Sequence, residues 1–171
     1  MKKLLIMLLF TGVVLSCAGT GGNMTGIEKN SESVIPGSGD QGGTDDFSDV
    51  IGVEWKLTEV SINGTATPFS RNTLSNNFSD SFTLTFNGEM LSGRGAPNLY
   101  SAPYTLGGNR SISTLIMRST LMAAIFEPEH LKEHDFYIYM QYIHSWRLSG
   151  EILELSSLLD DSREVILIFE K

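Results

Sequence analysis

The stretch FTLTFNGEMLSGR, residues 82–94, carries the clearest structural signal in this 171-residue chain. Residues 82–86 alternate between large apolar side chains and threonine, a pattern typical of a β-strand with one buried face. Asn87 and Gly88 follow, and this pair is strongly favoured in tight hairpin turns because both residues tolerate a positive φ. The stretch therefore predicts a β-hairpin whose second strand runs through residues 89–94.

The same kind of signal recurs on both sides of this hairpin. Strand patterns lie at residues 54–58, 136–148, 152–156 and 165–169, with turn pairs at 63–64 and 149–150. The last of these strands is an unbroken apolar run, which is typical of a strand covered on both faces. Strands of this kind, joined by short turns, predict an antiparallel sheet.

One segment departs from the strand pattern. Residues 119–126 (STLMAAIF) are rich in helix formers and predict a short helix that Pro128 bends or ends, with a further helical turn at 129–133. We therefore expect an α+β fold, mainly β, in which an antiparallel curved sheet of about seven or eight strands packs on one short helix.

Residues 1–16 have the features of a secretory signal peptide. Two lysines precede an apolar run at residues 4–15, which is too short for a membrane-spanning helix because that needs about 20 apolar residues. Cys17 follows directly and is the only cysteine in the chain. It has no second thiol with which to form an intramolecular disulfide.

The run Val14-Leu15-Ser16-Cys17 resembles the lipobox of bacterial lipoproteins. The resemblance implies that the signal is cut before Cys17, that a diacylglycerol is attached to the sulfur, and that the new amine is often acylated. Two or more acyl chains hold a protein stably on a bilayer, whereas one holds it marginally. We therefore expect a lipid-anchored protein of the bacterial cell envelope, at the outer membrane or cell surface. The alternative is an ordinary signal peptide with a stray cysteine near the cut.

Residues 17–50 are rich in glycine, serine, threonine and acidic residues and have almost no large apolar side chains. Such a segment cannot bury enough surface to offset its chain entropy, so it predicts a disordered acidic tether. Residues 37–42 match G-x-G-x-x-G, but the strand and helix that a dinucleotide site needs are not expected around them. The composition changes at Ile51, and residues 51–171 are long enough for one modest domain.

The charge balance of the exported chain is acidic. Removal of Lys2 and Lys3 with the signal takes the Lys and Arg count from 12 to 10 against 20 Asp and Glu, a net charge near −10. Contacts to phosphate dominate nucleic-acid affinity, so this composition argues against a nucleic-acid partner. We expect two kinds of partner: the membrane, which the protein reaches through the lipid on Cys17, and an envelope protein or peptide.

Three motifs from Ile51 onward carry a resemblance to a known family. They are the strand Trp55-Lys56-Leu57 with the turn Ile62-Asn63-Gly64, the segment GAPNLYSAPY at 95–104, and TLMAA at 120–124. Together they resemble the META domain, the family that includes the HslJ-type heat-shock proteins. The resemblance implies a META-like domain at 51–171 and a role in stress tolerance. It also implies that the family's two cysteines fall on Pro97 and Ala124, so a disulfide or redox role at that pair is absent here.

Asn98, Tyr100 and Tyr104 match the family motif usually written G-C-N-x-Y-x-G-x-Y. They could form a polar and aromatic recognition surface. Alternatively, Asn98 satisfies a turn while the two tyrosines pack on the sheet with their hydroxyls hydrogen-bonded. The structural alternative is favoured, because residues that tie a segment to a core are commoner than ligand contacts.

The sharpest chemical motif is His130-Leu131-Lys132-Glu133-His134, which matches H-x-x-E-H. On a helix, His130 and His134 would share a face and could hold zinc, with Glu133 beside them as a base. The segment before the next strand is too short for more than about two helical turns, and a small β domain would have to supply the third ligand. We therefore expect no catalytic residues, no metal site and no cofactor.

On these grounds we expect a lipid-anchored envelope protein whose META-like domain is not an enzyme. We expect it to bind a protein, a peptide or a lipophile in envelope stress tolerance. Two alternatives remain open: a zinc hydrolase that uses residues 130–134, and a purely structural surface lipoprotein.

Overall fold

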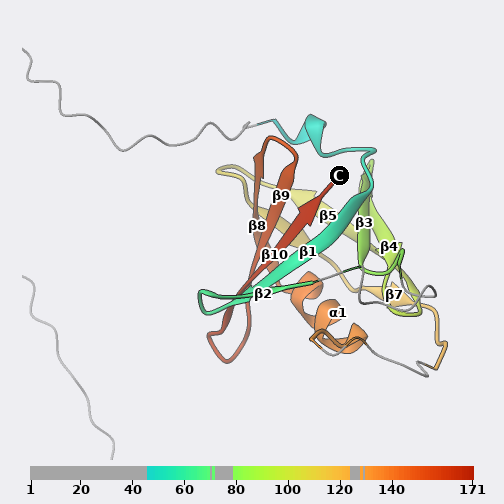
Figure 1. Ribbon diagram of the computed structural model, residues 1–171. Helices are drawn as coiled ribbons and strands as arrows, with labels where there is room; N and C mark the ends of the chain where they lie inside the picture. The colour runs from blue at the N-terminus through green and yellow to red at the C-terminus, as the bar shows by residue number, and fades with distance from the viewer. Residues whose placement is uncertain (1–45, 70, 72–78, 124–127, 129) are drawn as a thin grey trace, which may run out of the picture. The chain divides into compact units, whose positions relative to one another are not determined.

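The computed structural model describes residues 46–69, 71, 79–123, 128 and 130–171 (Figure 1). Within these residues the strands are β1 (Trp55–Ile62), β2 (Thr65–Pro68), β3 (Thr83–Asn87), β4 (Met90–Arg94), β5 (Leu99–Leu106), β6 (Ile112–Thr114), β7 (Arg118–Ser119), β8 (Ile143–Ser149), β9 (Ile152–Leu158) and β10 (Glu164–Glu170). A short 3-10 helix, η1 (Phe47–Asp49), precedes them, and an α-helix, α1 (Glu133–Gln141), lies between β7 and β8.

The strands form one antiparallel sheet in the order β6-β5-β4-β3-β1-β10-β9-β8, with β2 paired to β1 and β7 paired to β5. The sheet curls until its two edge strands meet, where Ser111 and Ser145 form an isolated bridge and the Trp146 N–H donates to the Arg110 carbonyl at 3.0 Å. The result is a nearly closed barrel. The expected fold class, a mainly β protein with an antiparallel curved sheet and one α-helix, is confirmed.

The hairpin at residues 82–94 is also confirmed, with one change in its turn. Asn87 pairs with Met90, so Gly88 and Glu89 are the central residues of the turn. Of these two, Gly88 has the positive φ, at 56°, which is the pattern of a type II′ turn rather than type I′. The turn at Asn63-Gly64 has a positive φ at both residues, as expected.

The expected helix position is wrong. Residues 118–119 form β7, and residues 120–123 are not helical; 124–127 lie outside the described residues. The α-helix is instead α1, of which residues 136–141 were expected to begin the long strand at 136–148 and Glu133 to end a helical turn at 129–133. Its aromatic and β-branched side chains favour a strand locally, but Phe136 and Met140, four residues apart, are fully buried on one face of the helix.

Each end of the barrel is covered by a helix. Figure 1 shows η1 and α1 at opposite ends of the sheet. Phe136 of α1 packs edge-on against Phe82 and lies near Tyr100, while Phe47 of η1 packs against Phe86 and Trp146. The largest fully buried side chains between these ends are Trp55, Phe82, Phe86, Phe136, Phe169, Leu57, Leu84, Leu91, Met140, Leu153, Leu155 and Leu167.

The folded part starts earlier than the expected domain start at Ile51. Phe47 and Val50 belong to the core, and the Trp55 indole N–H donates to the Val50 carbonyl at 3.0 Å. The expected signal peptide, Cys17 and most of the expected tether lie outside the described residues. No helix within the described part of the chain is long and apolar enough to cross a membrane.

Candidate functional site

A pocket of about 610 Å³ opens at the end of the barrel that η1 covers. Two aromatic side chains from separate elements, Phe47 and Trp146, line it together with the loop between β5 and β6. Its lining residues are Phe47, Leu106, Gly107, Gly108, Asn109, Arg110 and Trp146. Its volume lies within the range that is typical of small-molecule sites.

The aromatic side of the pocket is firmly held. Phe47 and Trp146 pack edge-on with their ring centroids 4.9 Å apart. Phe47 also packs edge-on against Phe86 at 5.0 Å and lies 5.9 Å from Tyr104. Both lining rings are almost fully buried and held by this packing, so the edges that they present form a fixed apolar floor of small exposed area.

The loop between β5 and β6 contains a strained turn. The Ser111 N–H donates to the Gly108 carbonyl at 3.1 Å, and the two residues between them, Asn109 and Arg110, both have a φ of 57°. Two positive φ values in succession are the pattern of a type I′ turn, in which asparagine is well tolerated and the second position favours glycine. Arginine in this conformation costs about 1–2 kcal/mol.

The turn is tied directly to the aromatic floor. The Arg110 carbonyl accepts the backbone N–H of Trp146 at 3.0 Å, and the Gly107 N–H donates to the Ser111 carbonyl at 3.0 Å. A side chain at Gly107 would meet the Ser111 hydroxyl in its present rotamer, so Ser111 would have to turn away to admit it. The lining therefore combines this apolar floor with two polar residues of the loop, Asn109 and Arg110.

The structure gives Tyr100 and Tyr104 a packing role. Both side chains are buried, and each hydroxyl donates to a backbone carbonyl at 2.7 Å: Tyr100 to Thr83 and Tyr104 to Gly88. Burial raises the pKa of both tyrosines above its ordinary value. These contacts correspond to the structural alternative, since neither ring offers a face to a partner.

Asn98 is buried and bridges two distant segments. Its side-chain oxygen accepts from the backbone N–H of Met122 at 2.6 Å and from the Thr120 hydroxyl at 2.9 Å. Its amide nitrogen donates to Glu133 at 2.6 Å and to the Met122 carbonyl at 3.1 Å. Asn98 therefore holds the start of β5 against residues 120–122 and α1. Of the expected family cysteine positions, Pro97 lies next to this network and Ala124 lies outside the described residues.

Glu133 is the acceptor at the centre of the same network. Its carboxylate accepts the backbone N–H groups of Ala96 at 2.5 Å and Asn98 at 2.7 Å, together with the Tyr137 hydroxyl at 3.0 Å. Burial and the neighbouring Glu133 charge raise the pKa of Tyr137, so that phenol stays protonated as a donor. A side chain at Gly95 would collide with the Glu133 carboxylate and the Tyr137 hydroxyl, so glycine permits this close approach.

These contacts argue against the zinc hydrolase. Glu133 is the first residue of α1 and His130 precedes the helix, so the motif does not lie on one helical face. His130 and His134 are exposed, whereas Glu133 is buried and held by four hydrogen bonds. Among the described residues, no group of three His, Cys, Asp or Glu side chains is placed to hold a metal ion.

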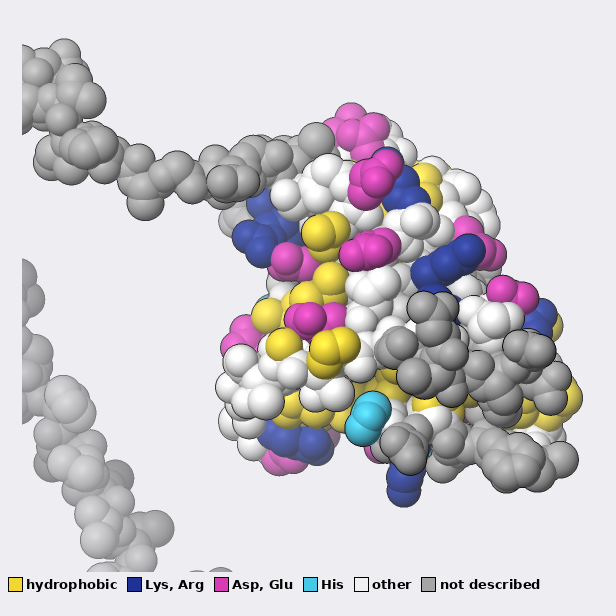
Figure 2. All heavy atoms as spheres, in the orientation of Figure 1, with side chains coloured by type: hydrophobic (Ala, Val, Ile, Leu, Met, Phe, Trp, Pro, Cys, Tyr) yellow, Lys and Arg dark blue, Asp and Glu magenta, His cyan; other side chains and the backbone are white. Residues whose placement is uncertain are grey.

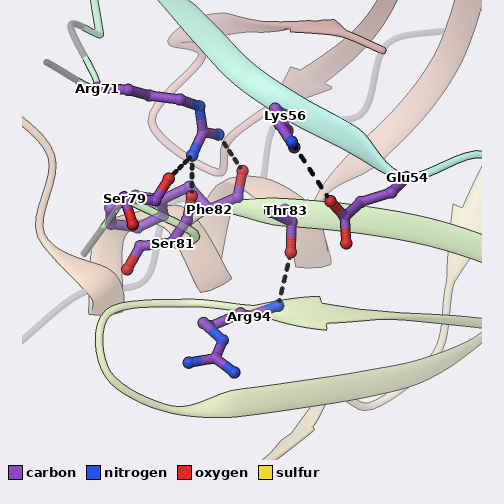
Figure 3. Close-up of polar contacts among 8 residues, drawn as sticks. All are labelled: Glu54, Lys56, Arg71, Ser79, Ser81, Phe82, Thr83 and Arg94. Carbon is purple, nitrogen blue, oxygen red and sulfur yellow. Dashed lines mark hydrogen bonds and ion pairs between the residues drawn. The ribbon is translucent and has the colours of Figure 1, made fainter. Parts of the chain in front are cut away.

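A second polar cluster, drawn in Figure 3, supports the entry into β3. The Arg71 guanidinium donates to the carbonyls of Ser81 at 2.7 Å, Ser79 at 3.0 Å and Phe82 at 3.2 Å, and its burial lowers the pKa of Arg71. Phe82 has a φ of 53°, which is unusual for a bulky residue. The Phe82 carbonyl also accepts the backbone N–H of Leu57 at 3.0 Å. The cluster therefore stabilises the strained backbone at Phe82.

The charged side chains on the face that Figure 2 draws are of both signs. Asp and Glu alternate there with Lys and Arg, without an extended patch of one sign. Two of the described ion pairs, Arg147 with Glu154 at 2.8 Å and Arg163 with Asp161 at 2.6 Å, join neighbours within hairpins.

The sequence interpretation missed the pocket. Its lining comes from residue 47, residues 106–110 and residue 146, which meet only because the sheet closes on itself. The Gly107-Gly108-Asn109 sequence is a turn signal that could have pointed to the loop. Phe47, an isolated aromatic residue at the end of the expected tether, is the other available signal.

Comparison with known proteins agrees with this architecture. A family model described as META domain matches residues 48–171. A protein from Burkholderia xenovorans, solved by NMR, has a TM-score of 0.55 at 20% identity over 85% of this chain and 97% of its own. A DUF4847 family protein from Bacteroides vulgatus, solved by crystallography, has a TM-score of 0.50 at 11% identity over 72% and 95%. At these identities the likeness concerns the fold alone. No curated protein matched this chain.

Proposed function

Because the match over residues 48–171 shows that this chain belongs to the META domain family, we propose that its META domain is a non-catalytic binding module of the bacterial cell envelope. In this proposal the domain is anchored to a membrane by lipid on Cys17 and binds an envelope protein, a peptide or a lipophile. The proposal includes the domain boundaries expected from the sequence, which are a signal peptide at 1–16 and a tether that leads into the domain.

The proposal rests mainly on the pocket at the η1 end of the barrel. The floor is preformed, because Phe47 and Trp146 are already packed against each other and against the core. A preformed apolar pocket with a few polar groups is the usual form of a small-ligand or side-chain site. The loop between β5 and β6, with Asn109 and Arg110 at its tip, supplies those polar groups.

The chemistry of the buried polar groups supports a non-catalytic role. The buried carboxylate of Glu133 is held by four donors, which leaves it fixed in a structural network rather than beside an open site. Tyr100 and Tyr104 donate to main-chain carbonyls in the same way. A catalytic base or nucleophile needs access to a reacting atom, and these groups face the protein interior.

The anchoring part of the proposal rests on the sequence. A basic, apolar N-terminal segment ending at Ser16-Cys17 fits a lipoprotein signal, and an acidic tether after it keeps the domain away from anionic lipid. The link to stress tolerance rests on the family resemblance alone.

Two measurements on cells test the proposal. Cys17→Ser should shift the protein from the membrane fraction to the soluble fraction and abolish incorporation of labelled fatty acid; a variant that stays lipidated would contradict the anchor. Cross-linking of the lipidated protein in intact cells, followed by mass spectrometry, should enrich a specific partner over an unrelated lipoprotein. A deletion strain with a weakened envelope and no specific partner would favour the purely structural alternative instead.

A further inference from the structure

We propose that the outward surface of β4, β5 and β7 binds an acidic, partly apolar segment of an envelope protein. Carboxylates of that segment pair with Arg94 and Arg118, and its apolar side chains cover Leu99 and Leu115. This inference rests on the proposed binding function and specifies the chemistry of a protein partner, at a surface made of residues other than those that line the pocket. We call this surface the β4–β5–β7 face, and its central residues are Ser92, Arg94, Leu99, Ser101, Leu115 and Arg118.

Strand register brings the two arginines to one surface. Burial alternates along β5, with Tyr100 inside, so Leu99 and Ser101 point outward. Side chains that lie directly opposite each other in an antiparallel pair share a face of the sheet. Arg94 of β4 lies opposite Leu99. Arg118 of β7 lies opposite Ser101. The two arginines therefore flank β5 on its outward side.

The segment that supplies this face carries only positive charge. Residues 90–126 contain three arginines and neither an acidic residue nor a lysine, in a chain with 20 aspartates and glutamates and a net charge of −8. Strand β3, which pairs with β4, has no acidic residue either. Salt screens charge interactions over about 8 Å at physiological ionic strength, so an approaching segment senses mainly the local charge. An acidic segment is therefore attracted to this face although the whole chain is acidic.

Both guanidinium groups are available for such a contact. Arg94 and Arg118 are exposed, and among the described residues neither guanidinium has a hydrogen-bond or ion-pair partner. Figure 3 shows the Arg94 side chain directed away from the other residues that it labels. A guanidinium binds a carboxylate through two parallel hydrogen bonds, and arginine is enriched in protein interfaces.

The register also sets the spacing of the acidic residues in the partner. Arg94 and Arg118 are two strands apart and offset by two residues, which puts their Cα atoms about 12 Å apart at the usual strand spacing and rise. Residues four positions apart in an extended peptide are separated by about 13 Å. We therefore expect two acidic residues about four positions apart in the segment that binds.

Apolar surface lies beside the two charges. Leu99 is 54% exposed and Leu115 is 58% exposed. The Leu115 N–H donates to the Pro103 carbonyl at 2.9 Å, so this leucine lies beside β5. Ser101, which is small and half-buried, lies between the positions of the two leucines along β5, so a partner chain can approach the sheet closely there. Covering the leucines removes apolar surface from water, which is favourable in proportion to the area.

A peptide selection tests this chemistry without assuming the identity of the partner. The mature chain from residue 17 with Cys17→Ser, which requires no detergent, is immobilised and used to select from a display library of random peptides. We expect the enriched peptides to carry two acidic residues about four positions apart, together with apolar residues. Enrichment of basic or uncharged peptides, or no enrichment at all, would overturn the inference.

The most enriched peptide is then synthesised, and its affinity is measured by fluorescence anisotropy. Replacing both arginines, Arg94→Ser with Arg118→Ser, should weaken binding about tenfold and remove most of its salt dependence. The matched control, Arg147→Ser with Arg163→Ser, removes the same charge from exposed positions in β8 and before β10, and should leave binding unchanged. Equal affinity of the Arg94 and Arg118 double variant and the unaltered chain would overturn the inference.

A second pair of variants tests the apolar part of the contact. Leu99→Thr keeps a residue that is favoured in strands but removes apolar surface, so it should weaken binding of the same peptide several-fold. Leu158→Thr makes the same change on β9, where the side chain is 55% exposed, and should have no effect. Equal losses from both variants would contradict a contact at Leu99.

The outcomes separate this inference from the broader proposal. If sedimentation detects a dimer of the mature chain that the Arg94 and Arg118 double variant lacks, a second copy occupies the face and the inferred partner is wrong. If no acidic peptide is enriched while cross-linking still captures a specific envelope partner, the inference fails and the binding function stands. If acidic peptides bind through both arginines but cross-linking captures nothing specific, the chemistry of the face is supported and the proposed function is not.

Discussion

The carboxylate of Glu133 accepts a hydrogen bond of 2.6 Å from the side-chain amide of Asn98, 35 residues away in the chain. Because Asn98 also holds the main chain of Met122 and Glu133 holds the main chain on both sides of Pro97, the pair ties three segments together. Packing and this buried polar network hold the region where the family resemblance would place a disulfide.

Glu133→Ala should destabilise the domain strongly. It leaves two backbone N–H groups, the Asn98 amide and the Tyr137 hydroxyl without their acceptor, and each unsatisfied buried group costs about 1–3 kcal/mol. We expect a loss of at least about 3 kcal/mol in the free energy of unfolding, measured by urea denaturation. Glu151→Ala, in the exposed β8–β9 turn, is the matched control and should change stability little. A small effect of Glu133→Ala would show that the network contributes little.

Tyr100→Phe separates the structural from the recognition alternative. The variant keeps the ring but leaves the Thr83 carbonyl without its donor, so we expect a loss of about 1–2 kcal/mol in the free energy of unfolding. Partner capture in cells should be unchanged at equal protein level. If a stably folded Tyr100→Phe protein no longer captures the partner, the hypothesis that Tyr100 belongs to a recognition surface would be supported instead.

Stability should fall at alkaline pH. Burial raises the pKa of Tyr100, Tyr137 and Tyr139 above the ordinary value of 10.0, so the unfolded chain loses these protons first. The stabilisation from each phenol is fully present below about pH 10 and is lost as the pH rises toward the folded pKa. Unfolding free energy measured from pH 8 to 11 should decline above about pH 10. Tyr137→Phe should decline less steeply, and an identical slope would contradict this assignment.

Zinc should have no effect on the domain. His130→Ala and His134→Ala remove exposed side chains, so each should change the free energy of unfolding by less than about 0.5 kcal/mol. The melting temperature of the unaltered protein should be the same with added zinc and with a chelator, and metal analysis should find no bound zinc. If zinc raises the melting temperature of the unaltered protein but not that of the variant with both histidines replaced, the zinc hydrolase alternative would be supported instead.

Several of the strands could be predicted from the sequence because their signals are local. Alternation at 82–86 and glycine at the turn are sufficient to place the β3–β4 hairpin, and the structure shifts its turn by one residue to Gly88-Glu89. The strand expected at 136–148 begins only at Ile143, and β2, β5, β6 and β7 were not predicted. The META family resemblance, which rested on the motifs around Trp55, Asn98 and residues 120–124, is confirmed by the family match.

The helix was misplaced because tertiary contacts override local preference. Residues 119–126 favour a helix in sequence, but Ser119 pairs with β5 as part of β7, and Asn98 holds the main chain of Met122. The residues between Phe136 and Met140 are aromatic or β-branched and favour a strand. Phe136 and Met140 are four residues apart, however, and this spacing places both in the core on one helical face. That spacing was the available signal for α1.

The pocket could not be predicted in the same way. Phe47 and Trp146 are almost 100 residues apart, and only closure of the sheet between Arg110 and Trp146 brings the turn over the aromatic floor. The strain at Arg110 is likewise a property of the folded turn, since arginine alone does not signal a positive φ.

Site-specific photo-cross-linking in intact cells tests the central claim most directly. A benzophenone amino acid is placed at Leu106, at the rim of the pocket, or at Leu158 on β9, which is similarly exposed but does not line it. If the META domain is a binding module that uses this pocket, position 106 should yield a specific adduct, with a protein or a small molecule, that position 158 does not. The same adducts from both positions, or none from position 106 in well-expressed protein, would contradict the claim.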